Sequence, residues 1–119
     1  MALNPIFGTA GSDSLQGTNA SDRLQGFAGD DTVIGVGVGD VVRLGQGDDS
    51  LVLSLRYTGG SIFGGEGNDQ VSVKGPFSFS TVAAGQGNDS IVFLVAPTRS
   101  YLAAESGDDT IVVQGSIRT

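Results

Sequence analysis

The chain has 119 residues, about the size of one domain, and carries a formal net charge of −7 from 13 acidic and 6 basic residues. This charge argues against nucleic acid and anionic lipid as partners, because both need a basic face. The absence of cysteine and histidine excludes disulfides and thiolate metal sites, and it removes the usual side chains of zinc sites and of Ser-His or Cys-His catalysis.

Residues 1–7, MALNPIF, precede the first repeat as a short lead-in. They contain no basic stretch followed by an apolar run, so they predict no signal peptide. No apolar run in the chain approaches the ~20 residues that a membrane helix needs. We expect Leu3, Ile6 and Phe7 to cap the first turn of the fold, with Pro5 blunting its open strand edge.

Residues 8–52 are five consecutive nonapeptides, each with Asp at its sixth position and Leu or Val at its eighth. The five units are GTAGSDSLQ, GTNASDRLQ, GFAGDDTVI, GVGVGDVVR and LGQGDDSLV. A period of nine fits no helix. Each unit instead has a glycine-rich, turn-forming half followed by strand-forming residues.

Residues 53–112 alternate between eleven-residue and nine-residue units, and residues 113–119 form a tail. The longer units LSLRYTGGSIF, VKGPFSFSTVA and FLVAPTRSYLA alternate with GGEGNDQVS, AGQGNDSIV and AESGDDTIV. Across the whole chain, the tetrapeptide Gly-[Asp/Asn/Ser]-Asp-[Thr/Ser/Gln] recurs at steps of 18, 18, 20, 20 and 20 residues. We therefore expect residues 8–119 to form a single repeat domain.

Two successive units would make one full turn of a flattened coil, in the order strand, turn, strand, turn. The sequence thus predicts an all-β, right-handed parallel β-solenoid of about six turns with two sheets of short parallel strands. The apolar residue at the eighth position should face inward. The predicted core ladder is Leu15, Leu24, Val33, Val42, Leu51, Val71, Ile91 and Ile111, with Ile62, Val82 and Leu102 keeping the inward register in the longer units.

The repeats over about residues 8 to 112 resemble the GGxGxDxUx nonapeptides of RTX-type (hemolysin-type) calcium-binding proteins. This resemblance implies a parallel β-roll with calcium held between the loops of successive turns. Two features depart from the pattern. GTNASD and GVGVGD lack glycine at the fourth place, and the eleven-residue units contain no Asp.

The solenoid period places six sixth-position carboxylates on one edge, at the strand spacing of about 4.8 Å. They would repel one another without a metal, whereas a divalent cation between each neighbouring pair would bridge them. Calcium suits this geometry better than magnesium, which demands a strict octahedron. The six acids are Asp13, Asp31, Asp49, Asp69, Asp89 and Asp109, and their five intervals predict about five ions.

Backbone carbonyls of the turns would complete each shell of six to eight oxygens. The expected carbonyl ligands are those of Gly11, Gly29, Gly45, Gly47, Gly65, Gly67, Gly85, Gly87 and Gly107. The residues at the fifth position are Asp30, Asp48, Asn68, Asn88 and Asp108, which could cap the turns or act as further ligands.

On the opposite edge, Asp22 and Asp40 could bracket one further ion, which would raise the count to six or more. Beyond Arg43 this edge has no carboxylate, so apolar contacts must hold its turns together. Its additional residues Tyr57, Phe77, Phe79, Pro97 and Tyr101 could pack as edge cover or could form a strip that binds a partner.

The acids repeat with the solenoid and form no unique catalytic constellation, so we expect no enzyme. Two non-enzymatic functions remain open. The favoured one is a structural unit that folds on calcium and stacks head to tail into a homo-oligomer or filament. The other is an RTX calcium-binding module of a larger, type I-secreted toxin, hydrolase or adhesin. Resting cytosol holds too little calcium for such sites, so both functions predict a secreted or cell-surface protein of bacterial type.

Overall fold

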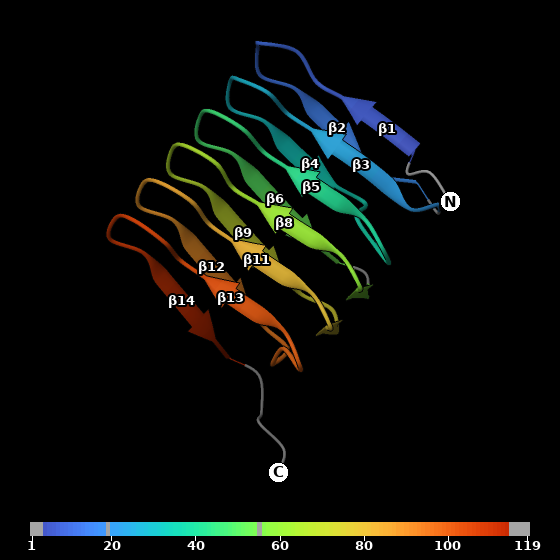
Figure 1. Cartoon of the computed structure of the whole chain (residues 1–119), viewed down its shortest axis with the longest axis vertical. Helices are drawn as coiled ribbons and strands as arrows, with labels where there is room; N and C mark the ends of the chain where they lie inside the picture. Colours follow the sequence, from blue (N-terminus) through green and yellow to red (C-terminus); the bar gives the residue numbers. More distant parts are fainter. Residues whose placement is uncertain (1–3, 19, 55, 115–119) are drawn as a thin grey trace.

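The computed structural model describes residues 4–18, 20–54 and 56–114 as a flattened coil of short strands, with no helix among them. Figure 1 shows the strands stacked in two layers along one axis. The strands are parallel and form a β-solenoid of about five turns, close to the six predicted from the repeat count. The predicted fold class is therefore confirmed.

Two six-stranded sheets form the walls of the coil. The first has the order β1-β3-β5-β8-β11-β13 and consists of Asn4–Phe7, Asp22–Gln25, Val41–Arg43, Ser61–Phe63, Thr81–Ala83 and Tyr101–Ala103. The second has the order β14-β12-β9-β6-β4-β2 and consists of Thr110–Val113, Ser90–Phe93, Gln70–Val73, Ser50–Leu53, Thr32–Ile34 and Ser14–Gln16. A two-stranded pair, β7 (Tyr57–Thr58) with β10 (Phe77–Ser78), lies in the longer units.

The register of both sheets follows the sequence period. In the second sheet Leu15 pairs with Val33, and the ladder continues in register to Ile91 and Ile111. In the first sheet Ile62 pairs with Val42 on one side and with Val82 on the other. The predicted inward residues up to Ile91 are buried, Leu102 is partly buried, and Ile111 is 39% exposed because it lies on the last strand.

The eleven-residue units fill their edge of the coil with aromatic side chains. Tyr57 and Phe77 are buried and stack at 5.4 Å between ring centroids, and Phe93 meets Phe77 edge-on at 5.3 Å. The Tyr57 hydroxyl donates a 2.6 Å hydrogen bond to the carbonyl oxygen of Asp40. Tyr57 and Phe77 thus pack as edge cover, which is one of the two roles predicted for the residues of this edge.

The other aromatics of this edge point outward. Phe79 is 61% exposed and Tyr101 is 67% exposed, while Pro97 is half-buried. Phe79 and the neighbouring Arg99 both have a positive φ, of 50° and 47°. The Arg99 guanidinium lies over the Phe79 ring at 5.6 Å. Packing therefore explains Tyr57 and Phe77 but not Phe79 and Tyr101.

The lead-in contributes a strand. β1 pairs with β3, which aligns Ile6 with Leu24, and Ile6 packs partly buried against the core. Phe7 does not cover the core, because it is 51% exposed and lies edge-on to Phe27 on the outer face of the sheet. Pro5 lies within β1, and the expected contribution of Leu3 falls outside the described residues.

Replacing Tyr57 with Phe should lower the free energy of unfolding by about 0.5–1.5 kcal/mol, the net value of one buried hydrogen bond. The ring packing against Phe77 stays in place, so the decrease in the free energy of unfolding reports the contribution of the Tyr57 hydroxyl alone. Thermal unfolding in saturating calcium measures it. Tyr101→Phe is the matched control and should change nothing, since Tyr101 is exposed; equal effects of the two substitutions would contradict the role of the Tyr57 hydroxyl.

Candidate calcium-binding edge

Six sixth-position acids lie one above another in the turns that lead into the second sheet. Asp31, Asp49, Asp69 and Asp89 are each no more than 3% exposed, although they carry ionisable side chains. Asp13 and Asp109, in the end turns, are half-buried. Buried carboxylates require partners, so the contacts of these side chains decide what the edge can do.

One oxygen of five of these carboxylates, those of Asp31 to Asp109, joins neighbouring turns. The backbone N–H of each of the first five acids donates to Oδ1 of the acid one turn further along the chain. These bonds are Asp13 to Asp31 at 2.8 Å, Asp31 to Asp49 at 2.7 Å, Asp49 to Asp69 at 3.0 Å, Asp69 to Asp89 at 2.8 Å and Asp89 to Asp109 at 2.8 Å. The acids therefore form the continuous column that the period predicted.

The other oxygen of five of these acids has no hydrogen-bond partner. The five unpartnered atoms are Oδ2 of Asp31, Asp49, Asp69, Asp89 and Asp109, all buried. An unsatisfied buried acceptor is costly, and a negative one more so. A hard cation with all-oxygen coordination would satisfy such atoms, and the donor set fits calcium.

Each turn supplies only one carboxylate to this column. In the described part of the chain, no three acidic side chains come together as a ready-made metal cluster. Further ligands would therefore have to be backbone carbonyl oxygens, as the sequence predicted. The carbonyls of Gly45 and Gly65 each accept one N–H, from Glu66 and Gln86, and a carbonyl oxygen retains a second lone pair.

Left-handed backbone at two places shapes each of these turns. At the second position φ is 70° at Phe27, 88° at Gly45, 86° at Gly65, 88° at Gly85 and 67° at Glu105. At the fourth position Gly29, Gly47, Gly67, Gly87 and Gly107 have φ between 89° and 110°. A Cβ on Gly47 would meet the carbonyl oxygen of Gly29, so glycine here lets successive turns approach at backbone contact. No feature of the repeat pattern indicated that Phe27 and Glu105 adopt the same left-handed conformation.

Comparison with known families agrees with this chemistry. The model of the RTX calcium-binding nonapeptide repeat matches four copies, over residues 7–42 and 61–73. The chain contains RTX calcium-binding repeats. These repeats are structural calcium-binding units and not catalytic ones. No curated protein and no solved structure matches the chain.

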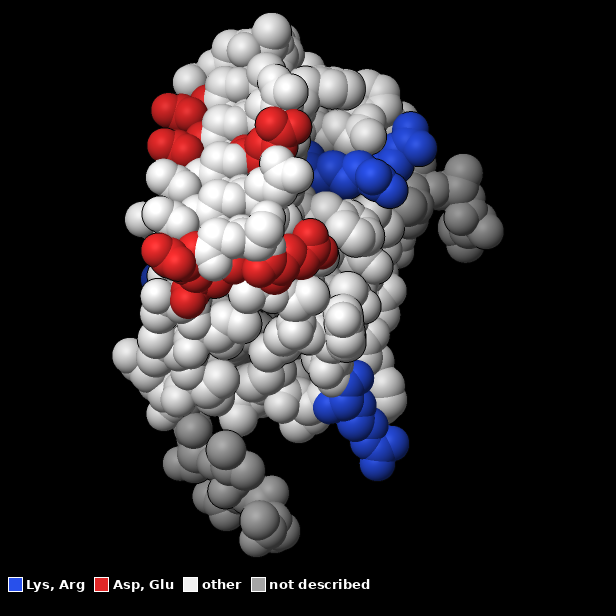
Figure 2. Space-filling view, turned by 60° about the vertical axis from the view of Figure 1, so that its left-hand side comes forward, with Lys and Arg blue, Asp and Glu red and all other residues white. Residues whose placement is uncertain are grey.

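The fifth-position residues of the RTX units form a second, exposed ladder. Asp30 Oδ1 accepts the N–H of Asp48 at 2.9 Å, and Asp48 Oδ1 accepts the N–H of Asn68 at 2.8 Å. Asn68 and Asn88 continue this pattern upward. These bonds connect the fifth-position residues of successive turns, and the capping and ligand roles considered for these residues both stay predictions. Figure 2 shows acidic side chains in several separate groups over the left and centre of the view, with the two larger groups of basic side chains on the right.

The opposite edge of the RTX coil differs in its hydrogen bonding. Asp22 Oδ2 accepts the Thr18 N–H at 2.6 Å, and Asp22 Oδ1 accepts the Thr18 hydroxyl at 2.8 Å and the Asn4 side-chain amide at 3.0 Å. Asp40 Oδ1 accepts the Asp22 N–H at 2.6 Å, and Asp40 Oδ2 accepts the Gly37 N–H at 2.7 Å. The predicted ion between Asp22 and Asp40 would find no unpartnered carboxylate oxygen there.

Asp13, the first acid of the column, resembles Asp22. Its Oδ2 accepts the Thr9 N–H at 2.5 Å, and its two oxygens share the Thr9 hydroxyl at 3.0 and 3.2 Å. The contacts of Thr9 and Thr18 with these acids were not predicted from the sequence. The available signal was a threonine four residues before the acid, in the two units that begin with Gly-Thr.

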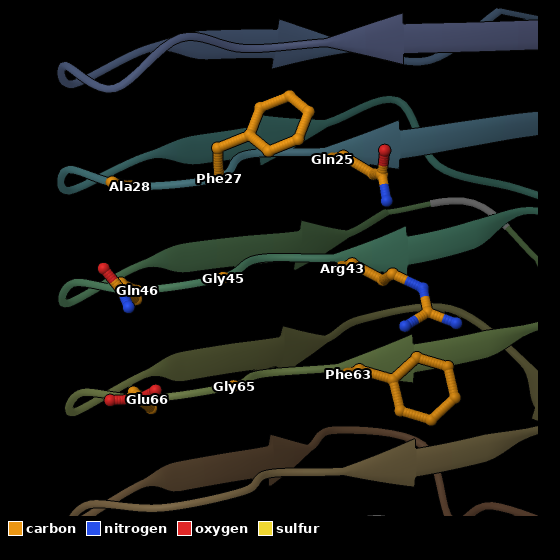
Figure 3. Close-up of a pocket in the computed structure, with 9 residues that line it drawn as sticks. All are labelled: Gln25, Phe27, Ala28, Arg43, Gly45, Gln46, Phe63, Gly65 and Glu66. Atoms are coloured by element: carbon orange, nitrogen blue, oxygen red, sulfur yellow. The ribbon is translucent and has the colours of Figure 1, made fainter.

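A groove of about 520 Å³ lies beside the column and is bordered by the side chains shown in Figure 3. Its floor is the backbone of Gly45 and Gly65, and the Arg43 guanidinium lies 5.0 Å from the centroid of the Phe63 ring. Glu66 is the one carboxylate among the lining residues. A single acid without a nucleophile or a second acid beside it provides no general acid–base pair.

Burial sets the protonation of the column. Desolvation raises the pKa of Asp49 to about 6 and that of Asp69 to about 8, and the charges of neighbouring acids add to both shifts. Burial likewise raises the pKa of Asp31 and of Asp89. For Asp22, burial acts upward, but the bonds from Thr18 and Asn4 lower the pKa below its ordinary value.

These shifts predict how the calcium-free chain responds to pH. A carboxyl whose pKa is raised in the fold binds more protons folded than unfolded, so the fold gains stability as pH falls from about 8 towards 4. Far-UV circular dichroism of the calcium-free protein should therefore show more β-structure at pH 5.5 than at pH 8. In saturating calcium the trend should reverse, because protons then compete with the ion. Calcium-free order that increases with pH would contradict the assignment.

Proposed function

We propose that this chain is a calcium-folded RTX β-roll that serves outside the cell as a structural unit. The observation that supports this most directly is the row of five buried, unpartnered Oδ2 atoms on one edge. We infer that the ligands are the carboxylates of Asp31, Asp49, Asp69, Asp89 and Asp109, together with carbonyl oxygens of the stacked turns, and that they hold about five ions.

Electrostatics explains why folding should require the ion. Two carboxylates about 5 Å apart repel by roughly 3 kcal/mol at an effective dielectric constant near 20. The column contains several such neighbours, and the core between the two sheets is thin. Metal binding therefore supplies folding free energy that apolar burial alone does not.

The proposed location follows from the affinity range of such sites. Calcium sites in extracellular modules have dissociation constants of about 0.1–1 mM, far above the calcium level of resting cytosol. A chain that folds in this range is unfolded before export and folds outside. The alternative function, a calcium-binding module within a larger secreted toxin, hydrolase or adhesin, relies on the same calcium-dependent folding.

Two neighbouring residues provide a matched test of the proposed ligands. Asp49 is buried in the column, whereas Asp48 is exposed in the ladder of fifth-position residues. Asp49→Asn should raise the calcium concentration at the folding midpoint by about tenfold or more. Asp48→Asn makes the same change in charge, keeps the Oδ1 acceptor, and should shift the midpoint by less than about twofold.

Calcium titration followed by far-UV circular dichroism gives both midpoints. Wild-type spectra that are identical in excess chelator and in millimolar calcium would remove the proposed calcium-dependent folding. Equal shifts for the two Asn variants would remove the assignment of Asp49 as a ligand.

Assembly is a second candidate function, and the C-terminal end of the coil supports it. On β14, Ile111 is 39% and Val113 41% exposed, whereas their partners Ile91 and Phe93 on β12 are buried. Among the described strands, β13 and β14 are the last of their sheets, and no further strand pairs with their outer edges. We propose that β1 and β2 of a second copy extend these sheets head to tail.

The same geometry limits what would join the copies. Thr9 already satisfies the Asp13 carboxylate at the N-terminal end. Strand pairing and apolar contact would therefore hold the junction, and the calcium column would stop there.

Sedimentation velocity at high protein concentration in calcium tests this assembly. Wild-type protein should form chains of copies, and Val113→Glu should abolish them by placing a charge in the junction. Val38→Glu, at an exposed valine away from the last strand, introduces the same charge and should leave assembly intact. A strictly monomeric wild type would rule out assembly and leave the module function.

A further inference from the structure

The acids of the nine-residue units fall into two groups that differ at the second residue of the unit. Where Oδ2 is unpartnered, the second residue is left-handed: Phe27, Gly45, Gly65, Gly85 or Glu105. Where the second residue is Thr9 or Thr18, it is outside the left-handed region and the acid four residues later is fully hydrogen-bonded. The remaining acid, Asp40, follows Val36, which is also outside the left-handed region, and both of its oxygens accept N–H groups, from Asp22 and Gly37. The correlation covers both edges of the coil.

The two threonine turns have the same internal hydrogen bonds. In each, the threonine N–H donates to Oδ2 of the acid, at 2.5 Å for Asp13 and 2.6 Å for Asp22. In each, the hydroxyl donates to Oδ1 and accepts the N–H two residues on, that of Gly11 at 3.1 Å and that of Ala20 at 3.2 Å. Two independent copies of one geometry indicate a specific local motif.

Backbone geometry explains why the acid of a turn is either fully hydrogen-bonded or has an unpartnered Oδ2, but not both. With an ordinary φ, Thr9 and Thr18 each direct the N–H at the acid and add a hydroxyl donor, and in the unit of Val36 the next N–H, that of Gly37, reaches Asp40. With a left-handed φ, no bond from that N–H to the acid forms, and Oδ2 remains buried without a donor. A cation is attracted to an oxygen without donors and repelled by the positive ends of N–H and O–H groups.

We propose that the second residue of each unit decides whether its turn binds calcium, and that Thr9 and Thr18 close the first two turns with hydrogen bonds in place of the ion. This inference rests on the proposed calcium function. Asp13 and Asp22 lie in the first two repeat units, one on each edge of the coil, and in the described chain no acid lies one coil before either of them. The threonines, with Asn4 at Asp22, satisfy charges that no lower turn could bridge.

The last unit, AESGDDTIV, allows a test of whether a threonine at the second position is sufficient to replace the ion with hydrogen bonds. Glu105 is an exposed residue with φ 67°, and Asp109 four residues later has an unpartnered Oδ2. Glu105→Thr recreates the Thr-to-Asp spacing of the first two units at the end of the stack, where few contacts depend on it. Glu105→Ala removes the same charge but offers no hydroxyl donor, so it is the matched control.

Native mass spectrometry in saturating calcium counts the bound ions in each variant. We expect Glu105→Thr to bind one ion fewer than Glu105→Ala, and Asp13→Asn to bind as many as the wild type. Thr9→Val should also keep the wild-type count, while lowering the unfolding temperature by the same amount at low and high calcium.

Equal counts for Glu105→Thr and Glu105→Ala, or a lost ion in Asp13→Asn, would overturn the proposal. A wild-type protein that binds no calcium at all would instead overturn the proposed function. The two failures are therefore distinguishable in one series of spectra.

Discussion

A buried carboxylate oxygen that the protein itself leaves without a donor is the constraint on which this fold depends. It recurs in five successive turns, at Asp31, Asp49, Asp69, Asp89 and Asp109. The other oxygen of each acid, Oδ1, accepts a backbone N–H from the preceding turn. The side chains therefore cannot rotate into solvent without breaking these hydrogen bonds between turns. When these acids are ionised, negative charge is thereby fixed at the strand spacing of about 4.8 Å, and either protonation or a bound cation compensates it.

The two edges of the coil are held by different forces. On one edge the column of acids needs cations, while on the other edge hydrogen bonds satisfy Asp22 and Asp40 and the aromatic rings of Tyr57 and Phe77 fill the longer units. The two extra residues of those units provide room for the rings. The proposed calcium sites thus lie on one side of a scaffold whose other side is closed by hydrogen bonds and packing, so under this proposal the ion would control folding of that one edge.

The repeat period was sufficient to predict the parallel sheets, the inward ladder from Leu15 to Ile91 and the alignment of the six acids, because strand register is set by strict periodicity. It could not predict which acids have donors. That depends on the backbone conformation of the second residue of each unit. A glycine at this position, such as Gly45, suggests a left-handed φ, but Phe27 and Glu105 have a left-handed φ that their residue types do not suggest. The outward placement of Phe79 was also hidden, since it follows from a left-handed backbone at a non-glycine residue.

The most direct measurement is a crystal structure of the calcium-loaded protein with anomalous diffraction recorded to locate calcium. An ion is expected at about 2.3–2.6 Å from Oδ2 of each of the five unpartnered acids. No ion is expected at Asp13, Asp22 or Asp40, where hydrogen bonds occupy both carboxylate oxygens. Anomalous maps without a peak along the column, with those oxygens bonded to water or to protein donors, would contradict the central claim.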